Sequence, residues 1–452
     1  MLRLALPVLV EQFLGVLVGL VDTWLAGNFL AGEAPLAAIG LMSYVLWLLP
    51  SLFAAIAIGA TAMTARCVGA GQAGLAVRVT GQALVLGLAL AAAATALAVV
   101  AGEPFVAVMQ LRGDAAELAL RYLRILTPVI PAVMVEQVGI ACLRGAGDTF
   151  SGFVTMVVVN LVNVVLSTCL VLGWGPFPEL GWEGLAIGTA SGHAVGAVLV
   201  LGLLIRGRAG LTLRWRRLRP NPDLMRRLLR IGVPGGIDVL AILLCHLWFV
   251  GIINSLGTVD AAAHSLGVRI ESLAYLPGSA FQVAAATLVG QFLGAGDRRR
   301  AVRAALLACL GAGSVMVAAG GVMFFGAAWL TELFAPQQGA EVAGTTVPLL
   351  RLVALAMPAL ALTMVLSGAL RGAGDTRWPL LFTFLGFLGV RIPAAYLLAW
   401  PSVPLPGLWY ELPGMGWGVL GAWYAMVADV FVRAGLVVWR FRHGGWQRIR
   451  VW

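Results

Sequence analysis

The heptapeptide Leu-Arg-Gly-Ala-Gly-Asp-Thr stands twice in this chain, at Leu143–Thr149 and again, letter for letter, at Leu370–Thr376. The two copies begin 227 residues apart in a chain of 452 residues. A second pair of segments, Val68–Gln72 and Leu293–Asp297, shares Gly-Ala-Gly at nearly the same spacing. Two independent matches at one spacing indicate that the chain duplicates a unit of about half its length.

The composition places this duplicated unit in a membrane. Hydrophobic residues make up 61% of the chain, charged residues only 11%, and the mean hydropathy is +0.96. Apolar runs of roughly 20 residues or more recur along the whole length, and each can cross a bilayer as a helix. They predict an all-α integral membrane protein with twelve transmembrane helices in two pseudo-symmetric six-helix bundles, at about 5–27, 40–65, 81–102, 120–142, 151–174, 185–206, 231–255, 265–291, 302–326, 346–369, 378–400 and 418–440.

The predicted domains follow from these spans. Residues 1–206 form an N-terminal six-helix bundle, 207–230 an Arg-rich cytoplasmic linker, 231–440 a C-terminal six-helix bundle and 441–452 a cytoplasmic tail. We expect no cleavable signal peptide, because Glu11 and Asp22 interrupt the first apolar run.

The basic residues predict the orientation. All thirty are Arg, and with a cytoplasmic N-terminus they gather in the inner loops. This positive-inside pattern predicts a multi-pass protein of the cytoplasmic (inner) membrane with both termini in the cytoplasm. The net charge of +10 therefore indicates topology and contact with anionic membrane lipid, and not a nucleic-acid partner.

Several functional classes are not supported by the residue pattern. The five cysteines have no paired spacing and the four histidines form no ligand cluster, so no disulfide framework, metal site or cofactor is expected. A membrane enzyme or receptor would need a clustered catalytic set or an appended soluble domain, and the sequence has neither. We therefore expect a transporter of small molecules.

Asp22, deep in the first span, is the residue expected to couple transport to an ion. A carboxyl group in the hydrocarbon region usually faces a cavity or a partner, and it can carry a proton or hold a small cation. Asn163 and Ser167 share one face of the fifth span, and Thr189 lies in the sixth. These neutral oxygens suit a cation site or a cage for a protonated acid, although such side chains also commonly just join helices.

Other polar or large side chains within the spans are candidates for the substrate cavity. Glu11 lies on the same helix face as Asp22, roughly 16 Å away along the axis. In the second half, the position equivalent to Asp22 is Phe249, so the deep acid exists only in the first half. Simple packing is the alternative for the aromatic and Met residues. The candidates are Glu11, Met42, Trp47, Asn160, Glu271, Gln282 and Arg391.

These motifs, taken together and in order, resemble the multidrug and toxic compound extrusion (MATE) family across essentially the whole chain. The features that carry the resemblance are Val-Asp-Thr at Val21–Thr23, the Gly-Ala-Gly loops, the duplicated heptapeptide, Arg269–Gly278 and Val390–Pro393. The resemblance implies two six-helix bundles around a central cavity that opens alternately to each side. It also implies export of drug-like amphipathic organic cations by antiport of H⁺ or Na⁺, without a cofactor.

The resemblance extends to single residues in part. Asp22 matches the family's first-helix acid, Pro7 the proline at which that helix bends, and Asn163 and Thr189 the positions that accompany the acid. Ser167 stands where some members carry a second carboxylate. The acids of other branches fall on Ile242 and Leu360, so the chain resembles the DinF-like branch that couples through its N-terminal lobe.

Some points remain open at the level of the sequence. The coupling ion is either H⁺ or Na⁺, and we expect the protein to be a monomer. The alternative function is a flippase or carrier of a lipid-linked precursor or metabolite within the same superfamily. A major-facilitator carrier also has twelve spans, but the inner loop after the second span holds Gly69–Gly71 and not that family's basic signature.

Overall fold

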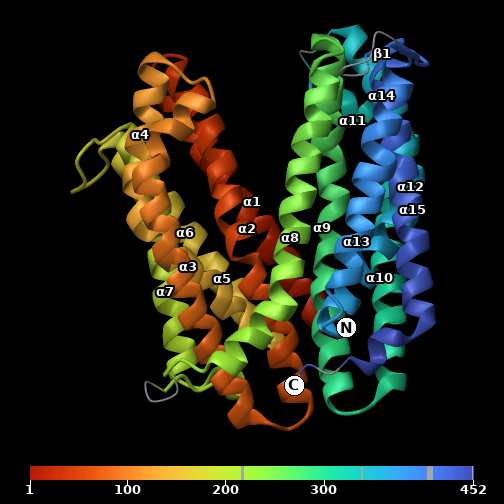
Figure 1. The fold of residues 1–452 in the computed structure, drawn as a ribbon. Coiled ribbons are helices and arrows are strands. Elements are labelled where there is room, and N and C mark those ends of the chain that lie inside the picture. Colours follow the sequence, from red (N-terminus) through yellow and green to blue (C-terminus); the bar gives the residue numbers. More distant parts are fainter. Residues whose placement is uncertain (215–217, 337–338, 405–410, 450, 452) are drawn as a thin grey trace. The chain divides into compact units, whose positions relative to one another are not determined.

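The structure is a computed structural model that describes residues 1–214, 218–336, 339–404, 411–449 and 451, and it is almost entirely helical (Figure 1). The chain divides into two compact units. The N-terminal unit is chiefly Leu2–Gly236, and the C-terminal unit is chiefly Ile237–Leu293 with Asp297–Arg450. The division falls inside the helix α8 (Pro222–Asn254), and the domain boundaries expected from the sequence stay a prediction.

The N-terminal unit is a bundle of long helices. Two prolines, Pro128 and Pro131, interrupt its fourth span, because each removes a backbone N–H that a continuous α-helix would use. A 3₁₀ turn, η1 (Thr127–Val129), therefore separates the two α-helical parts. The α-helices before α8 are α1 (Leu2–Phe29), α2 (Ala34–Gly69), α3 (Ala73–Val108), α4 (Gly113–Leu126), α5 (Ile130–Gly145), α6 (Phe150–Leu172) and α7 (Trp182–Ile205), followed by the short η2 (Arg208–Gly210).

The C-terminal unit repeats this plan with local additions. Its helices are α9 (Thr258–Gly294), α10 (Arg298–Phe325), α11 (Ala327–Phe334), α12 (Ala340–Gly372), α13 (Arg377–Gly386), the π-helical turn η4 (Phe387–Arg391), α14 (Ile392–Ala399), α15 (Gly418–His443) and η5 (Gly445–Arg448). A hairpin joins α14 to α15, with β1 (Ser402–Pro404) antiparallel to β2 (Glu411–Pro413) and Ser402 opposite Pro413. The hydropathy pattern did not predict α11, η4 or the hairpin, because each is too short to produce an apolar run.

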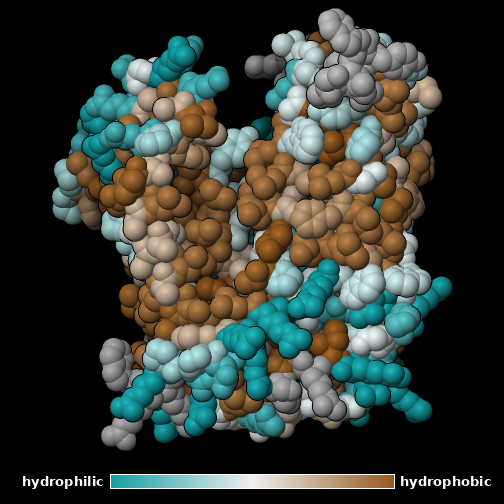
Figure 2. All heavy atoms as spheres, in the orientation of Figure 1, coloured by the Kyte–Doolittle hydropathy of each residue, from teal (hydrophilic) through white to brown (hydrophobic). Residues whose placement is uncertain are grey.

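The prediction of an all-α protein with twelve spans is confirmed. Within the described part of the chain, twelve helical segments are long and apolar enough to cross a membrane, with α4–α5 and α13–α14 each counted as one segment. Most helices extend beyond the predicted apolar runs; α2, for example, covers Ala34–Gly69 against the expected 40–65. On the face seen in Figure 2, each unit carries a band of hydrophobic residues that gives way to hydrophilic residues towards its ends.

The duplicated Gly-Ala-Gly segments end helices in the same way. After α5, the amide of Asp148 donates to the carbonyl of Leu143 and the amide of Gly147 to that of Arg144, both at 2.9 Å. These two bonds form a Schellman motif, which needs one residue in the left-handed backbone conformation, and glycine adopts this conformation with the least strain. The second glycine of all four segments has a positive φ: Gly71 (+70°), Gly147 (+93°), Gly296 (+77°) and Gly374 (+86°).

An apolar cluster surrounds the C-terminal part of α1. Buried residues of α1, α2, α4 and α7 pack together there, among them Leu25, Met42, Tyr122 and Trp182. Each of these four side chains is at most 5% exposed. The cluster holds α1 against the helices that carry the polar partners of Asp22.

Candidate functional site in the N-terminal unit

Asp22 is completely buried in α1 and accepts hydrogen bonds from three neutral donors on three other helices. Its Oδ2 accepts from the hydroxyl of Thr189 on α7 at 2.6 Å and from that of Tyr122 on α4 at 3.1 Å. Its Oδ1 accepts from Nδ2 of Asn163 on α6 at 3.3 Å. The structure therefore brings Asp22, Asn163 and Thr189 together, as the sequence suggested.

Ser167 joins this group one step further out. The Asn163 amide donates to the Ser167 hydroxyl at 3.3 Å and to the Thr189 hydroxyl at 2.9 Å, while no hydrogen bond links Ser167 to Asp22 in the described structure. Ser167 is fully buried because Gly188 of α7 leaves it room: a β-carbon at Gly188 would collide with its side chain. Sequence-based reasoning thus named Asp22, Asn163, Ser167 and Thr189 but not the order in which they contact one another.

Tyr122 is the member that the sequence analysis missed. It lies 100 residues from Asp22 along the chain, and its ring packs against Trp182 with centroids 5.8 Å apart. Its hydroxyl is the polar end of an otherwise apolar, fully buried side chain. The one available signal was a tyrosine near the start of the fourth span, because a buried tyrosine hydroxyl usually finds a hydrogen-bond partner.

The chemistry of this group suits a proton or a small cation. Hydroxyl groups can either donate or accept, so Thr189 and Tyr122 can stabilise a carboxylate and can also turn an oxygen towards a bound cation. Within the described residues, no Arg lies within ion-pair distance of Asp22, and no cluster of three or more His, Cys, Asp or Glu side chains could hold a metal ion. The group therefore offers one carboxylate in a neutral, hydrogen-bonding surrounding.

Glu11 has a different environment from Asp22. Its side chain is 5% exposed and accepts a hydrogen bond from the guanidinium of Arg144 at 2.5 Å. The equivalent residues of the second half, Asp238 and Arg371, form the same ion pair. In both halves an acid four residues after a proline of the first span, Pro7 or Pro234, thus pairs with the Arg of the heptapeptide. The pair ties the first span of each half to the C-terminal end of its fourth.

The Asp of each heptapeptide pairs with an Arg near the end of the sixth span of its half, in η2 just after α7 in the first half and inside α15 in the second. Asp148 binds Arg208 at 2.6 Å, and Asp375 binds Arg440 at 2.7 Å. Burial opposes ionisation of Asp148, but hydrogen bonds from Arg208 and Ser151 outweigh it and hold the pKa of this carboxyl below its ordinary value. For Asp375, burial outweighs the contact with Arg440 and raises the pKa.

The remaining cavity candidates are dispersed over both units. Met42 is fully buried and packs in the apolar cluster around α1, and its place in a substrate cavity stays a prediction. Asn160 is also buried and donates to the carbonyls of Leu14 and Met156. Trp47 is 53% exposed, whereas Glu271 and Gln282 are partly buried.

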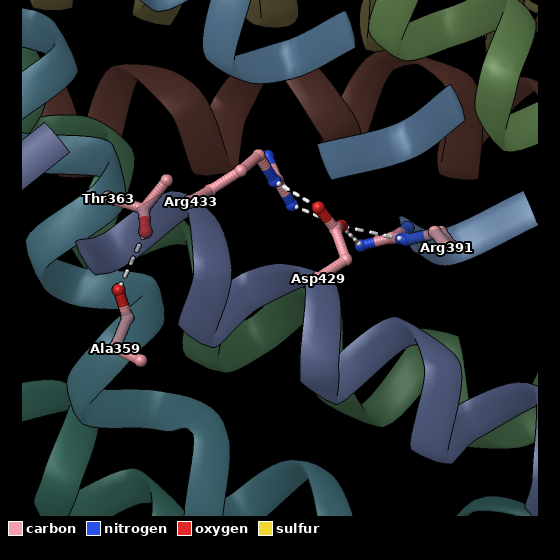
Figure 3. A network of polar contacts seen from close by, with 5 residues as sticks. All are labelled: Ala359, Thr363, Arg391, Asp429 and Arg433. Atoms are coloured by element: carbon pink, nitrogen blue, oxygen red, sulfur yellow. Dashed lines mark hydrogen bonds and ion pairs between the residues drawn. The ribbon is translucent and has the colours of Figure 1, made fainter. Parts of the chain in front are cut away.

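Arg391 belongs to a buried ionic network of the C-terminal unit (Figure 3). Asp429 of α15 lies between Arg391 of η4, at 2.7 Å, and Arg433 of its own helix, also at 2.7 Å. Both guanidinium groups also lie over the ring of Phe387, at 4.2 and 4.7 Å from its centroid. A π-helical turn often marks a functional site, and here it places Arg391 towards Asp429.

Comparison with known proteins gives the family. The sequence profile of the MatE family matches the chain twice, at residues 7–169 and 234–397, with starts that are separated by the spacing of the two heptapeptides. A probable multidrug resistance protein NorM of Thermotoga maritima is 27% identical over 449 residues, which cover 99% of this chain and 93% of that protein. The multidrug resistance protein MdtK of Pectobacterium atrosepticum is 26% identical over 452 residues, covering 97% and 94%.

Solved structures agree in fold. An outward-facing multidrug resistance MATE family transporter of the MOP superfamily superposes with a TM-score of 0.88 at 22% identity, covering 99% of this chain and 96% of that one. A MOP superfamily transporter from Pyrococcus furiosus, described as having a binding pocket of reverse polarity that suggests a different function, gives 0.87 at 23% with the same coverage. Since both halves of the sequence match the family profile and the whole fold follows its solved members, this chain belongs to the MATE family of multi-pass membrane transporters, which is not a family of enzymes.

Proposed function

We propose that this protein exports drug-like amphipathic organic cations by antiport of H⁺ or Na⁺, and that Asp22 carries the coupling ion. The observation that supports this most directly is the burial of Asp22 among three neutral donors. By contrast, Glu11, Asp238 and Asp429 are each bound to an Arg that neutralises them. A buried carboxylate without such a partner is the group best able to gain or lose a positive ion.

The coupling requires a difference between two conformers. An ion and a substrate drive each other across the membrane only if each binds one conformer more tightly, by a few kcal/mol. A change of one pKa unit at a carboxyl between the two conformers supplies about 1.4 kcal/mol. Movement of α1 at Pro7, which lies inside the continuous helix fifteen residues before Asp22, would change the surroundings of the carboxyl group.

Of the two ions, the proton fits the group of Asp22 better. A sodium site normally gathers several oxygen ligands and profits from more than one negative charge. Here Asp22 is the one carboxylate, and Ser167 contributes a hydroxyl where a second acid would add charge. On the same ground, we propose that the chain belongs with the DinF-type members of the family.

The membrane placement is part of the same proposal. The Arg-rich segment 206–230 and the Arg residues of the motif loops favour a cytoplasmic membrane protein with both termini inside. We propose that it works as a monomer. Fusion of a fluorescent reporter to either end, combined with protease protection of sealed cells, tests the orientation, and mass measurement in detergent tests the monomer.

Replacement of Asp22 tests the coupling role. Proteoliposomes containing wild type, Asp22→Asn or the control Glu33→Gln, an exposed acid just after α1, are given a fluorescent organic cation under a pH or a Na⁺ gradient. We expect wild type and control to concentrate the dye under one gradient, and Asp22→Asn to lose this uptake entirely. Equal accumulation by Asp22→Asn and wild type would contradict the proposal, and the effective gradient names the ion.

A second function has one supporting observation. The C-terminal unit buries two Arg side chains around the single carboxylate of Asp429, a local excess of positive charge. A superfamily member of the same fold is described as having a pocket of reversed polarity. A carrier of an anionic metabolite or lipid-linked precursor would make use of such charge. Competition of the dye assay by anionic amphiphiles, with no effect of organic cations, would favour this function.

A further inference from the structure

A second pair of buried titratable side chains lies in the N-terminal unit. Nδ1 of His193 on α7 is 2.9 Å from Oε2 of Glu136 on α5. The Glu136 side chain is 0% exposed and that of His193 is 13% exposed. Nothing in their sequence spacing connects them, since 57 residues and two helix junctions separate them.

Neighbouring glycines leave room for the carboxylates of Glu136 and Glu11. A β-carbon at Gly196, on the same helix as His193, would lie 3.0 Å from Oε2 of Glu136. A β-carbon at Gly152 of α6 would lie 2.8 Å from Oε2 of Glu11. Both distances are shorter than ordinary carbon–oxygen contacts, so the space beside each carboxylate depends on the absence of a side chain.

The burial of His193 and Glu136 disfavours a net charge on the pair. Oε1 of Glu136 is buried and has no hydrogen-bond partner in the part of the chain that the structure describes. With a neutral imidazole beside it, an ionised Glu136 would be a lone buried charge, which is costly. One proton shared by the pair removes the net charge. If that proton moves from Nδ1 to Oε2, an N–H bond breaks, an O–H bond forms, and the pair stays neutral.

The pair is coupled to Asp22 through α7. Thr189 and His193 are four residues apart and so lie on one face of that helix. The Thr189 hydroxyl binds Asp22, and the charge of Asp22 acts on the His193 imidazole. On the other side, the charge of Glu136 acts on Glu11, which binds Arg144. Titratable groups thus interact in sequence from Asp22, through His193, Glu136 and Glu11, to Arg144 at the end of α5.

We propose that His193 and Glu136 form a second proton-binding site of the N-terminal unit, which holds its proton more firmly when Asp22 is ionised than when Asp22 is neutral. This rests on the proposed function, because it assumes that Asp22 changes its charge during transport. When Asp22 takes up a proton or a cation, the attraction on the imidazolium disappears, and the pair releases its proton more readily. Because the pair loses a proton as Asp22 gains a positive ion, the net charge buried in the unit changes less than the charge at Asp22 alone.

The other helices around the pair bring few charges to it. Among the described residues, α1 supplies Asp22 and Glu11, and Tyr122 of α4 reaches Asp22. The groups that α6 places beside Asp22 are neutral, and the hydroxyls that α2 and α3 direct at α5 face Cys142. Among the described groups outside the pair, the charges that interact with it are therefore those of Asp22 and Glu11.

The state of His193 can be measured directly. Protein labelled at its histidine rings is titrated by NMR in detergent, and the signal of His193 is assigned by its loss in His193→Gln. We expect the fraction of imidazolium at a given pH to be smaller in Asp22→Asn and in Glu136→Gln than in wild type. The exposed control Glu33→Gln should leave it unchanged. A His193 titration identical in wild type, Asp22→Asn and Glu136→Gln would overturn the proposal.

A transport measurement distinguishes failure of this proposal from failure of the proposed function on which it rests. In proteoliposomes, we expect His193→Gln and Glu136→Gln to keep proton-driven dye uptake while changing the shape of its pH profile in the same way. A wild-type pH profile in both variants would refute the second site and leave the role of Asp22 intact. Proton-driven uptake that survives in Asp22→Asn would refute the proposed function instead. If both variants are inactive, the histidine titration decides.

Discussion

At the scale of single residues, two kinds of buried acid coexist in this protein. Glu11 and Asp238 hold Arg residues of the duplicated motif, whereas Asp22 receives only neutral hydrogen bonds. The difference follows from what each neighbour can do. An Arg holds a carboxylate in place and favours its ionised form, while hydroxyl and amide donors bind it without supplying a positive charge.

Replacing Glu11 should reduce stability much more than replacing an exposed acid. Glu11→Gln leaves the Arg144 charge without its 2.5 Å partner, and breaking such a buried pair typically costs about 3–5 kcal/mol. Asp238→Asn should cost a similar amount, because Asp238 and Arg371 repeat the arrangement. The control Glu103→Gln, from an exposed pair at 3.5 Å, should cost within about 1 kcal/mol. Thermal unfolding in detergent measures the differences, and equal Tm values for all three variants would refute this reading.

The stability that Asp148 provides should depend on pH. Its pKa is lower in the folded protein than the ordinary value near 3.9 that applies to the unfolded chain, because Arg208 and Ser151 bind the carboxylate. Folding is therefore favoured at pH values above the unfolded pKa, and this contribution is lost as the pH falls through the folded pKa. Asp148→Asn should lower Tm at neutral pH and differ less from wild type in acid. A Tm difference that grows in acid would contradict the sign.

At the scale of elements, the duplicated motif is a helix end rather than a catalytic signature. Its second glycine ends the helix in a left-handed turn, and its first glycine lets two helices approach closely. A β-carbon at Gly145 would lie 2.7 Å from the carbonyl oxygen of Thr61 on α2, and Gly372 packs in the same way on Ala286 of α9. The Arg and Asp of the motif then join this helix end to the first and sixth spans.

A methyl group at the left-handed glycine should destabilise the loop. Gly147→Ala and Gly374→Ala place a side chain at φ +93° and +86°, which costs roughly 1–2 kcal/mol. The matched control is Gly102→Ala inside α3, where no atom lies within 4 Å of the added carbon. That change should be neutral or stabilising by up to about 1 kcal/mol, because alanine favours the helix. Unfolding midpoints of the three variants test this, and a drop for Gly102→Ala alone would refute it.

At the scale of the whole molecule, the two halves share a framework but not a site. The family profile matches both halves, and both contain the same two motif-bound ion pairs. Among the described residues of the second half, the group around Asp22 has no equivalent, and Phe249 occupies the matching position and is fully buried. Duplication therefore preserved the elements that hold the bundle together, and the ion-binding chemistry that we propose belongs to one half.

This asymmetry predicts that acids of the C-terminal unit do not set the coupling ion. Glu271→Gln should leave the dependence of dye uptake on the imposed gradient unchanged, although the apparent affinity for the dye can shift. Asp22→Asn, measured beside it in the same vesicles, should lose that dependence. If Glu271→Gln uncouples uptake from the gradient while Asp22→Asn does not, the coupling site lies in the C-terminal unit.

The sequence by itself determined the twelve spans, the duplication and the identity of the deep acid. These are local properties: hydropathy over about 20 residues decides whether a helix crosses the membrane, and one repeated motif reveals the repeat. Three of the residues around Asp22 were also predicted, namely Asn163, Ser167 and Thr189, because Asn163 and Ser167 share a helix face and an acid in an apolar span needs polar neighbours.

Only the tertiary structure decided which side chains meet. Tyr122 lies 100 residues from Asp22, Arg144 lies 133 residues from Glu11, and Met42 packs in the apolar cluster around α1. Such contacts depend on how each helix is rotated and how closely its neighbours approach, and an apolar helix surface that faces lipid looks the same in sequence as one that faces protein. The contact between His193 and Glu136 is likewise a result of helix packing, and the spacing of these residues in the sequence does not indicate it.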